Sequence, residues 1–313
     1  MTSVAASIGG VRTAEARGAR RRRNALVPGW APWAFLAPFV LVFATFVLYP
    51  LAHSVVLSMQ QTFGPEATEF VGTRNFRFLL GDPRFWTAVR NTMLFTLGSV
   101  CTQIPVGLGL ALLLNRPGLR GRAFFRLVFF SPQLVGLVFV AQLAFVGFSK
   151  QNGLVNVALH GLFEDWRLDF DWVNDHVMLT LVVATFWMYV GFQMVYFLAA
   201  LQNVEADQVE AAMIDGAGPW QRFLNVTLPA IRPVAGFVVL LSVIGSLQLF
   251  ELPYLLYLGS GPNDRALTIV SYLYLTGFET RDLGYASAIG WVLAIMLVVA
   301  GVLARALLRE GRA

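Results

Sequence analysis

Six stretches of this chain contain no Asp, Glu, Lys or Arg, and they constrain its fold more than any other feature. They are residues 24–65, 91–115, 127–149, 176–204, 233–250 and 283–304. About 20 apolar residues in a helix cross the ~30 Å hydrocarbon core of a bilayer, since each residue adds about 1.5 Å. We therefore expect an all-α membrane protein with six transmembrane helices. These helices are predicted at residues 32–58, 88–114, 123–148, 177–202, 233–257 and 285–308.

The composition excludes several other classes of protein. Of the 313 residues, 57% are hydrophobic and 13% are charged, against about 25% charged in an ordinary soluble domain. This balance excludes a disordered chain and a nucleic-acid-binding module, and it argues against a soluble enzyme. The apolar runs are also too long for a membrane β-barrel, whose strands alternate over about ten residues. The single cysteine, Cys101, excludes an internal disulfide, and three scattered histidines do not suggest a zinc site.

The basic residues predict the orientation, because cytoplasmic segments of membrane proteins carry an excess of Lys and Arg. One predicted side of the membrane holds fifteen of the 23 basic residues. They lie in the N-terminal tail, the turn at 115–126, the loop at 203–232 and the C-terminus. The opposite side holds eight. Both termini and the loop 203–232 are therefore expected to be cytoplasmic.

The N-terminus imitates a signal peptide, because arginines precede an apolar run. A cleaved signal has an apolar core of about 7–15 residues, and the run here is far longer. We therefore expect an Arg-rich cytoplasmic tail at 1–29 and an uncleaved first helix within 30–59. Residues 87–308 would then form the core of the protein.

Three segments lie on the predicted outer side, and two of them, 60–86 and 258–284, are expected to be short connections. In the third, 149–176, apolar residues at helical spacing from Leu154 to Phe163 predict a short amphipathic helix. This helix is expected on the membrane surface or packed on the bundle. We interpret the acidic cluster that follows as a solvated loop rather than a calcium site. The cluster consists of Glu164, Asp165, Asp169, Asp171 and Asp175.

The cytoplasmic segment around Gly216 does not have the sequence of a simple connector. Gly216 can adopt a positive φ and end one short helix, and Pro219 suits the first turn of the next. Trp220, Phe223, Leu224 and Leu228 then recur on one face of that second helix. The pattern predicts two short helices with a sharp corner of small residues. Such an elbow could dock another protein or lie on lipid, and the periodicity alone does not separate the two.

At this segment the sequence resembles a known family. The string Glu210-Ala211-Ala212-Met213-Ile214-Asp215-Gly216-Ala217, followed by Phe223 and Leu228-Pro229, resembles the EAA signature of binding-protein-dependent ABC importer permeases. Leu198 to Gln202 before it, and Gly261-Pro262 and Leu283 to Ala288 after it, resemble the carbohydrate branch. The likeness is to the first permease of the maltose and glycerol-3-phosphate type, over about residues 30–308. Ser260 departs from the usual glycine.

The resemblance implies a type I ABC importer permease fold in the bacterial inner membrane and a transport role rather than an enzymatic one. It implies that Glu210, Ala211, Ala212, Asp215, Gly216 and Ala217 couple the chain to the ATPase. No Gly-x-x-x-x-Gly-Lys-Ser/Thr motif occurs, and the single lysine is Lys150, so we expect this chain to bind no cofactor itself. ATP and Mg would sit on two partner ATPase subunits. The other implied partners are a second homologous permease, an extracytoplasmic solute-binding protein and membrane lipid, with no nucleic acid.

The resemblance also places the substrate pathway on the fourth and fifth helices. Polar groups within apolar spans are functional candidates, and aromatic rings there can stack on a sugar. The candidates are Trp187, Gln193, Ser242, Ser246, Gln248, Phe250 and Glu251, with Tyr189 weaker. Each serine is equally a helix-packing residue, and Glu251 either binds hydroxyls or faces headgroup water.

Several alternatives remain at this point. We expect an oligosaccharide as substrate, because the only arginine in predicted helices four to six is Arg305, near the cytoplasmic end of the sixth. The same importer architecture for glycerol-3-phosphate, a polyamine or another small solute is the alternative. A membrane-embedded transferase needs convergent catalytic groups at one depth, and none is visible. A structural or export-related membrane protein would not explain the elbow.

Overall fold

The computed structural model describes residues 30–62, 68–151, 153–163, 165 and 167–309. The chain divides into two compact units, Met1–Val56 and Leu57–Ala313. The predicted tail, 1–29, lies outside the described residues. Helix α2 (Ala31–Phe43) continues through the π-helical turn η1 (Ala44–Leu48) into α3 (Tyr49–Leu57). The result is one apolar helix of 27 residues, as predicted for the first span.

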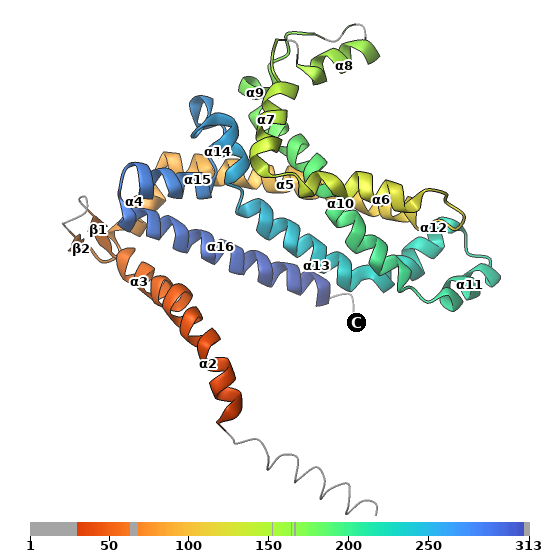
Figure 1. Cartoon of the computed structure of the whole chain (residues 1–313), viewed down its shortest axis with the longest axis horizontal. Helices are drawn as coiled ribbons and strands as arrows, with labels where there is room; N and C mark the ends of the chain where they lie inside the picture. The colour runs from red at the N-terminus through yellow and green to blue at the C-terminus, as the bar shows by residue number, and fades with distance from the viewer. Residues whose placement is uncertain (1–29, 63–67, 152, 164, 166, 310–313) are drawn as a thin grey trace, which may run out of the picture. The chain divides into compact units, whose positions relative to one another are not determined.

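The second unit is built on four long helices (Figure 1). They are α5 (Pro83–Leu114), α10 (Val177–Gln202), α13 (Leu228–Leu247) and α16 (Leu283–Arg309). Within the described part of the chain, five helices are long and apolar enough to cross a membrane. A bent pair makes a sixth if it counts as one span. The prediction of an all-α membrane protein is therefore confirmed.

The third predicted helix, 123–148, is not continuous. It consists of α6 (Arg122–Phe130), the 3₁₀ turn η2 (Ser131–Leu134) and α7 (Leu137–Gly147). The two halves are bent by 98°. Pro132 has no N–H to donate, and both Val135 and Gly136 have extended backbone. The prediction of one continuous helix was wrong, because the uncharged sequence continues without change through a break in the helical backbone.

The fifth predicted helix, 233–257, also differs from the structure. It begins at Pro219, as α12 (Pro219–Arg222), and passes through the π-helical turn η3 (Phe223–Thr227) into α13. It is interrupted at residues 248–250 before α14 (Glu251–Tyr257). Pro229 does not end the helix, because the wider π-helical turn precedes it where its ring would otherwise clash.

The segments predicted on the outer side contain more structure than the sequence suggested. A two-stranded antiparallel sheet pairs β1 (Gln60–Thr62) with β2 (Thr68–Phe70), with Gln60 opposite Phe70. Residues 60–86 also hold α4 (Arg74–Gly81), so the prediction of a short connection was wrong. It was wrong for 258–284 as well. That segment holds η4 (Pro262–Asp264), α15 (Ile269–Tyr274) and the π-helical turn η5 (Leu275–Glu279).

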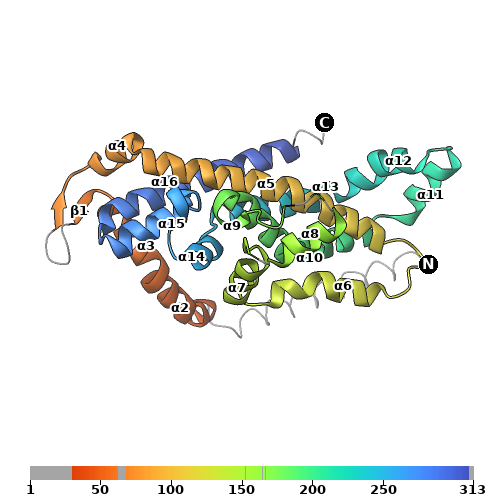
Figure 2. The same ribbon diagram turned by 90° about the horizontal axis from the view of Figure 1, so that it is seen from above.

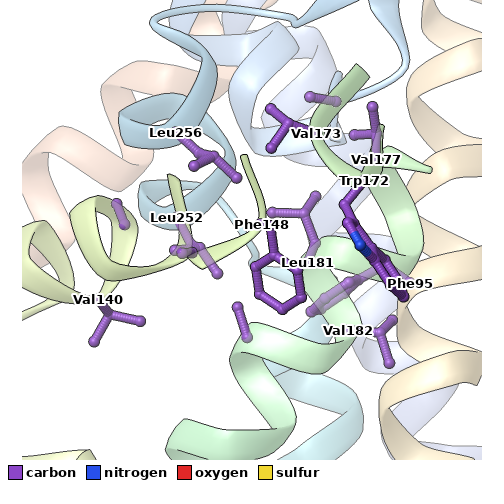
Figure 3. Close-up of a cluster of buried hydrophobic side chains, with 14 of the residues drawn as sticks. Phe95, Val140, Phe148, Trp172, Val173, Val177, Leu181, Val182, Leu252 and Leu256 are labelled. Carbon is purple, nitrogen blue, oxygen red and sulfur yellow. The ribbon is translucent and has the colours of Figure 1, made fainter. Parts of the chain in front are cut away.

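The amphipathic helix predicted in 149–176 is confirmed as α8 (Leu154–Leu162). Its buried Asn156 donates to the carbonyls of Leu168 and Phe170, and it accepts from the indole of Trp172 at 2.7 Å. Trp172 lies on α9 (Trp172–Asp175) and enters a buried apolar cluster with Phe148, which follows α7, and Leu252 of α14 (Figure 3). This cluster attaches the outer segment to the long helices.

Part of the acidic cluster in this segment is engaged by neighbouring residues. Asp169 pairs with Arg167 at 3.1 Å, and Asp171 caps α9 by accepting from the Asn174 N–H. Among the described residues, no group of three or more His, Cys, Asp or Glu side chains is placed to hold a metal ion. Glu164 lies outside the described residues.

Candidate functional site

The corner around Gly216 forms a complete helix stop. Helix α11 (Ala206–Ile214) ends with the Ala217 N–H donating to the Ala212 carbonyl at 2.9 Å and the Gly216 N–H donating to the Met213 carbonyl at 3.1 Å. These two bonds define a Schellman motif, which requires a left-handed residue after the cap. Gly216 supplies it with a φ of +79°. The predicted positive φ and helix stop are confirmed.

The next helix starts at once. Pro219 occupies its first turn, and the Gln221 side chain accepts from the Gly218 N–H at 2.9 Å. Contrary to expectation, this is not a second short helix, because α12 runs through η3 into α13 without a break. The elbow, defined here as residues 206–222, is therefore continuous with a long helix.

The elbow exposes apolar side chains at its corner. Ile214 is 88% exposed and Trp220 is 69% exposed. Of the six residues predicted to couple to a partner, Ala212 and Ala217 are half-buried, and Glu210, Ala211, Asp215 and Gly216 are exposed. Figure 2 shows α11 and α12 at the end of the second unit opposite α4. The structure thus exposes large apolar side chains on a corner at one end of the helices.

A second feature is a cavity of about 740 Å³ between α5, α10, α13 and the breaks in the third and fifth helices. Six of the seven predicted pathway residues line it. These are Gln193, Ser242, Ser246, Gln248, Phe250 and Glu251. Tyr189 also lines it, whereas Trp187 does not and is 44% exposed. Residues from two predicted helices therefore meet at one place.

A buried amide lies at the wall of this cavity. The Gln193 side-chain nitrogen donates to Gln103 Oε1 at 2.8 Å and to Ser242 Oγ at 3.1 Å. Its two hydrogens are thereby used, and its Oε1 is buried with no hydrogen-bond partner among the described residues. This network joins α5, α10 and α13. An unpaired buried acceptor costs about 1–3 kcal/mol, so Gln193 retains capacity for a water or ligand hydroxyl.

Two glutamines in the cavity lining were not predicted from the sequence. Gln103 lies on α5 and Gln133 on η2, and the Oε1 atom of Gln133 is also buried without a partner in the described part of the chain. Both are amides in uncharged stretches, which is the signal that identified Gln193. The resemblance placed the pathway on the fourth and fifth helices only, and the break that brings Gln133 to the lining was not predicted.

A polar cluster joins the first residues of α5 to η4, α15 and α16. Asp82, which caps α5, accepts hydrogen bonds from the hydroxyls of Tyr272 and Tyr285. Burial alone would raise the pKa of Asp82. The two tyrosines and backbone N–H groups outweigh it and lower the pKa. Burial and the bond to Asp82 together raise the pKa of Tyr272 to about 12. Beside them, Arg84 pairs with Asp264 at 3.0 Å.

Comparison with known proteins gives a consistent result. The sequence profile of the family described as "Binding-protein-dependent transport system inner membrane component" matches residues 103–309. The arabinooligosaccharides transport system permease protein AraP of Bacillus subtilis is 37% identical over 86% of this chain and 85% of its own length. The lactose transport system permease protein LacF of Rhizobium radiobacter is 35% identical, over 85% of this chain and 90% of LacF.

The fold is shared with a solved transporter. A chain from the crystal structure of a bacterial ABC transporter involved in the import of the acidic polysaccharide alginate superimposes with a TM-score of 0.76 and 26% identity. The match covers 90% of this chain and 96% of that chain. A chain from the crystal structure of a bacterial alginate ABC transporter in complex with alginate pentasaccharide-bound periplasmic protein shows the same fold, with a TM-score of 0.78.

Proposed function

This chain belongs to the binding-protein-dependent transport system inner membrane component family, and we propose that it is the permease subunit of an ATP-driven importer of neutral oligosaccharides. The observation that carries the proposal is the cavity of about 740 Å³, in which six of the pathway residues expected from the sequence converge. Its volume lies in the range of small-molecule sites. The chain would supply half of the pathway, and a homologous permease would supply the other half.

The chemistry of the lining supports a sugar as cargo. Four glutamines, 103, 133, 193 and 248, and two serines, 242 and 246, offer donors and acceptors for hydroxyl groups. Phe250, Phe192 and Tyr189 offer ring faces. The arabinooligosaccharide and lactose permeases that resemble this chain point to the same class of cargo. A glycerol phosphate is less suited, because no Lys, Arg or His is among the described residues that line the cavity.

The elbow supports a coupling role. One of the two partner ATPase subunits would receive it through its exposed corner, with Glu210, Ala211, Ala212, Asp215, Gly216 and Ala217 at the contact. Because α12 continues into α13, displacement of the corner would move a helix that lines the cavity. A rigid element can transmit such a motion, and a flexible loop cannot. ATP and Mg would be bound by those subunits. Both termini would be cytoplasmic, and an extracytoplasmic binding protein would deliver the cargo.

The test is uptake by the whole complex, co-expressed with its partner subunits and reconstituted in liposomes. ATP-driven uptake and ATPase stimulation would be measured with the loaded binding protein across arabinooligosaccharides, lactose, N,N′-diacetylchitobiose and glycerol phosphate. We expect stimulation by a neutral oligosaccharide. Stimulation by glycerol phosphate alone would overturn the sugar assignment, and a chain that assembles with no ATPase subunit would overturn the importer assignment.

A further inference from the structure

The cavity wall contains one charged residue among those described. Glu251 is the first residue of α14 and follows the non-helical residues 248–250. The other described lining residues are apolar, amide or hydroxyl side chains. Placing a carboxylate in a cavity within a membrane protein costs free energy unless water hydrates it, so such a residue is a functional candidate.

Glu251 has no local partner that would explain it as a structural residue. Its carboxylate makes no hydrogen bond or ion pair with any described residue, and the residue is exposed and lines the cavity. Two other carboxylates of the chain have partners: Asp264 is paired with Arg84, and Asp82 accepts hydrogen bonds from two tyrosine hydroxyls. Among the described residues, the negative charge of Glu251 is therefore left uncompensated inside the cavity.

An uncompensated charge in a cavity with low-dielectric walls acts over a longer range than it does in water. It raises the local concentration of cations and lowers that of anions. Neutral solutes are unaffected by the sign of the charge. The same carboxylate would repel the carboxylates of an acidic glycan or a phosphate group.

We propose that Glu251 is the specificity-determining charge filter of the cavity, which admits neutral glycans and excludes anionic ones. This inference rests on the proposed transport function for its biological meaning. The effect of the Glu251 charge on charged solutes does not depend on which sugar is carried. The filter belongs to this chain, whereas the binding protein selects cargo before delivery.

The test measures the electrostatic potential of the cavity in the assembled complex. In a Cys101→Ser background, Gln248→Cys places a thiol on the cavity wall, three residues before Glu251. The probes are a cationic and an anionic methanethiosulfonate reagent of similar size. The ratio of their reaction rates is compared with Glu251 present and with Glu251→Gln, which keeps the shape of the side chain. Glu279→Gln, an exposed carboxylate outside the cavity lining, is the matched control.

We expect the cationic reagent to be favoured with Glu251 present, and the ratio of rates to fall about tenfold in Glu251→Gln. Glu279→Gln leaves the ratio unchanged, and Glu251→Lys inverts it. A ratio that does not respond to Glu251→Gln overturns the proposal, including the case in which the second permease supplies a compensating cation. Because the readout needs no transport, failure of the filter and failure of the proposed function are distinguishable.

Discussion

The elbow and the cavity wall reach their shapes in opposite ways. The elbow is held by hydrogen bonds between residues at most five positions apart in the sequence, such as the bond from the Ala217 N–H to the Ala212 carbonyl. The cavity wall is closed by the bond between Gln193 and Gln103, which are 90 residues apart. A local signal in the sequence is therefore sufficient for the first, and the packing of several helices is required for the second.

Two glycines show the same difference between local conformation and packing of distant segments. A Cβ added at Gly216 would meet no described heavy atom within 4 Å, and the residue is glycine because its φ is +79°. Gly191 has an ordinary helical backbone, but a Cβ there would lie 1.9 Å from the Phe129 carbonyl oxygen. The backbone conformation favours glycine at position 216, and the close packing of α10 on the end of α6 requires glycine at position 191.

The largest effect is expected from Gly191→Ala. The added methyl group overlaps backbone that cannot move without displacing α6, so we expect a loss of about 3 kcal/mol or more. The measurement is the yield and thermal unfolding midpoint of the detergent-purified complex. Gly301→Ala, where no described atom lies within 4 Å, is the matched control and should be tolerated. Equal behaviour of the two variants would contradict the packing described for α10.

The next effect is expected from Gly216→Val, which places a β-branched residue in the left-handed region at a cost of about 1–2 kcal/mol. Assembly should persist, because no described residue packs on this position, while uptake per ATP hydrolysed falls at least tenfold. Gly216→Asn should retain most of the coupling, since asparagine tolerates this conformation. Normal uptake by Gly216→Val would show that the shape of the corner does not matter for transport.

A smaller effect is expected from Gln193→Met, which keeps the side-chain volume and removes the amide. We expect the KM for uptake to rise about tenfold, or about 1.4 kcal/mol, with a lesser change in kcat. Trp187→Phe serves as the control, because the sequence proposed Trp187 for the pathway and the structure leaves it outside the lining. If both variants shift KM equally, the cavity is not the substrate site.

The smallest effect is expected in the pH dependence of stability, through the polar cluster around Asp82. The pKa of Asp82 is lowered in the folded chain, so its contribution to stability is complete above the unfolded value near 3.8 and is lost as pH falls through the folded value. We expect the unfolding midpoint to decline below about pH 4 and Asp82→Asn to flatten that decline, by at most about 1 kcal/mol after solvent screening. Asp169→Asn, in an exposed pair, should not change the profile.

The sequence predicted the positions of the apolar helices and the glycine corner of the elbow for a physical reason. A long uncharged and apolar stretch is typical of a helix in lipid, and glycine followed by proline ends one helix and starts the next through local conformation alone. The fourth helix was placed at its observed bounds, Val177–Gln202. The break at Val135 and Gly136 was not predicted, because proline is common within membrane helices and the apolar pattern does not change there.

The cavity shows the limit of the same reasoning. Gln193, Ser242 and Ser246 were identified by residue type alone, and the structure brings them together. Gln103 and Gln133 were not identified, since their places in the lining depend on the pairing of α5 with α10 and on the break in the third helix. Trp187 was included because its ring suits a sugar, but the rotation of α10 directs it away from the lining.

The central claim is that the elbow contacts an ATPase subunit rather than lipid, and cysteine cross-linking tests it most directly. Ile214→Cys, at a position 88% exposed on the corner, would be placed in a Cys101→Ser background, with Leu258→Cys, at a position 85% exposed outside the elbow, as the control. In the assembled complex, a short thiol–amine cross-linker should join position 214 to the ATPase subunit and leave position 258 unjoined. Failure to cross-link at 214, together with quenching of a fluorophore there by brominated lipid, would contradict the account.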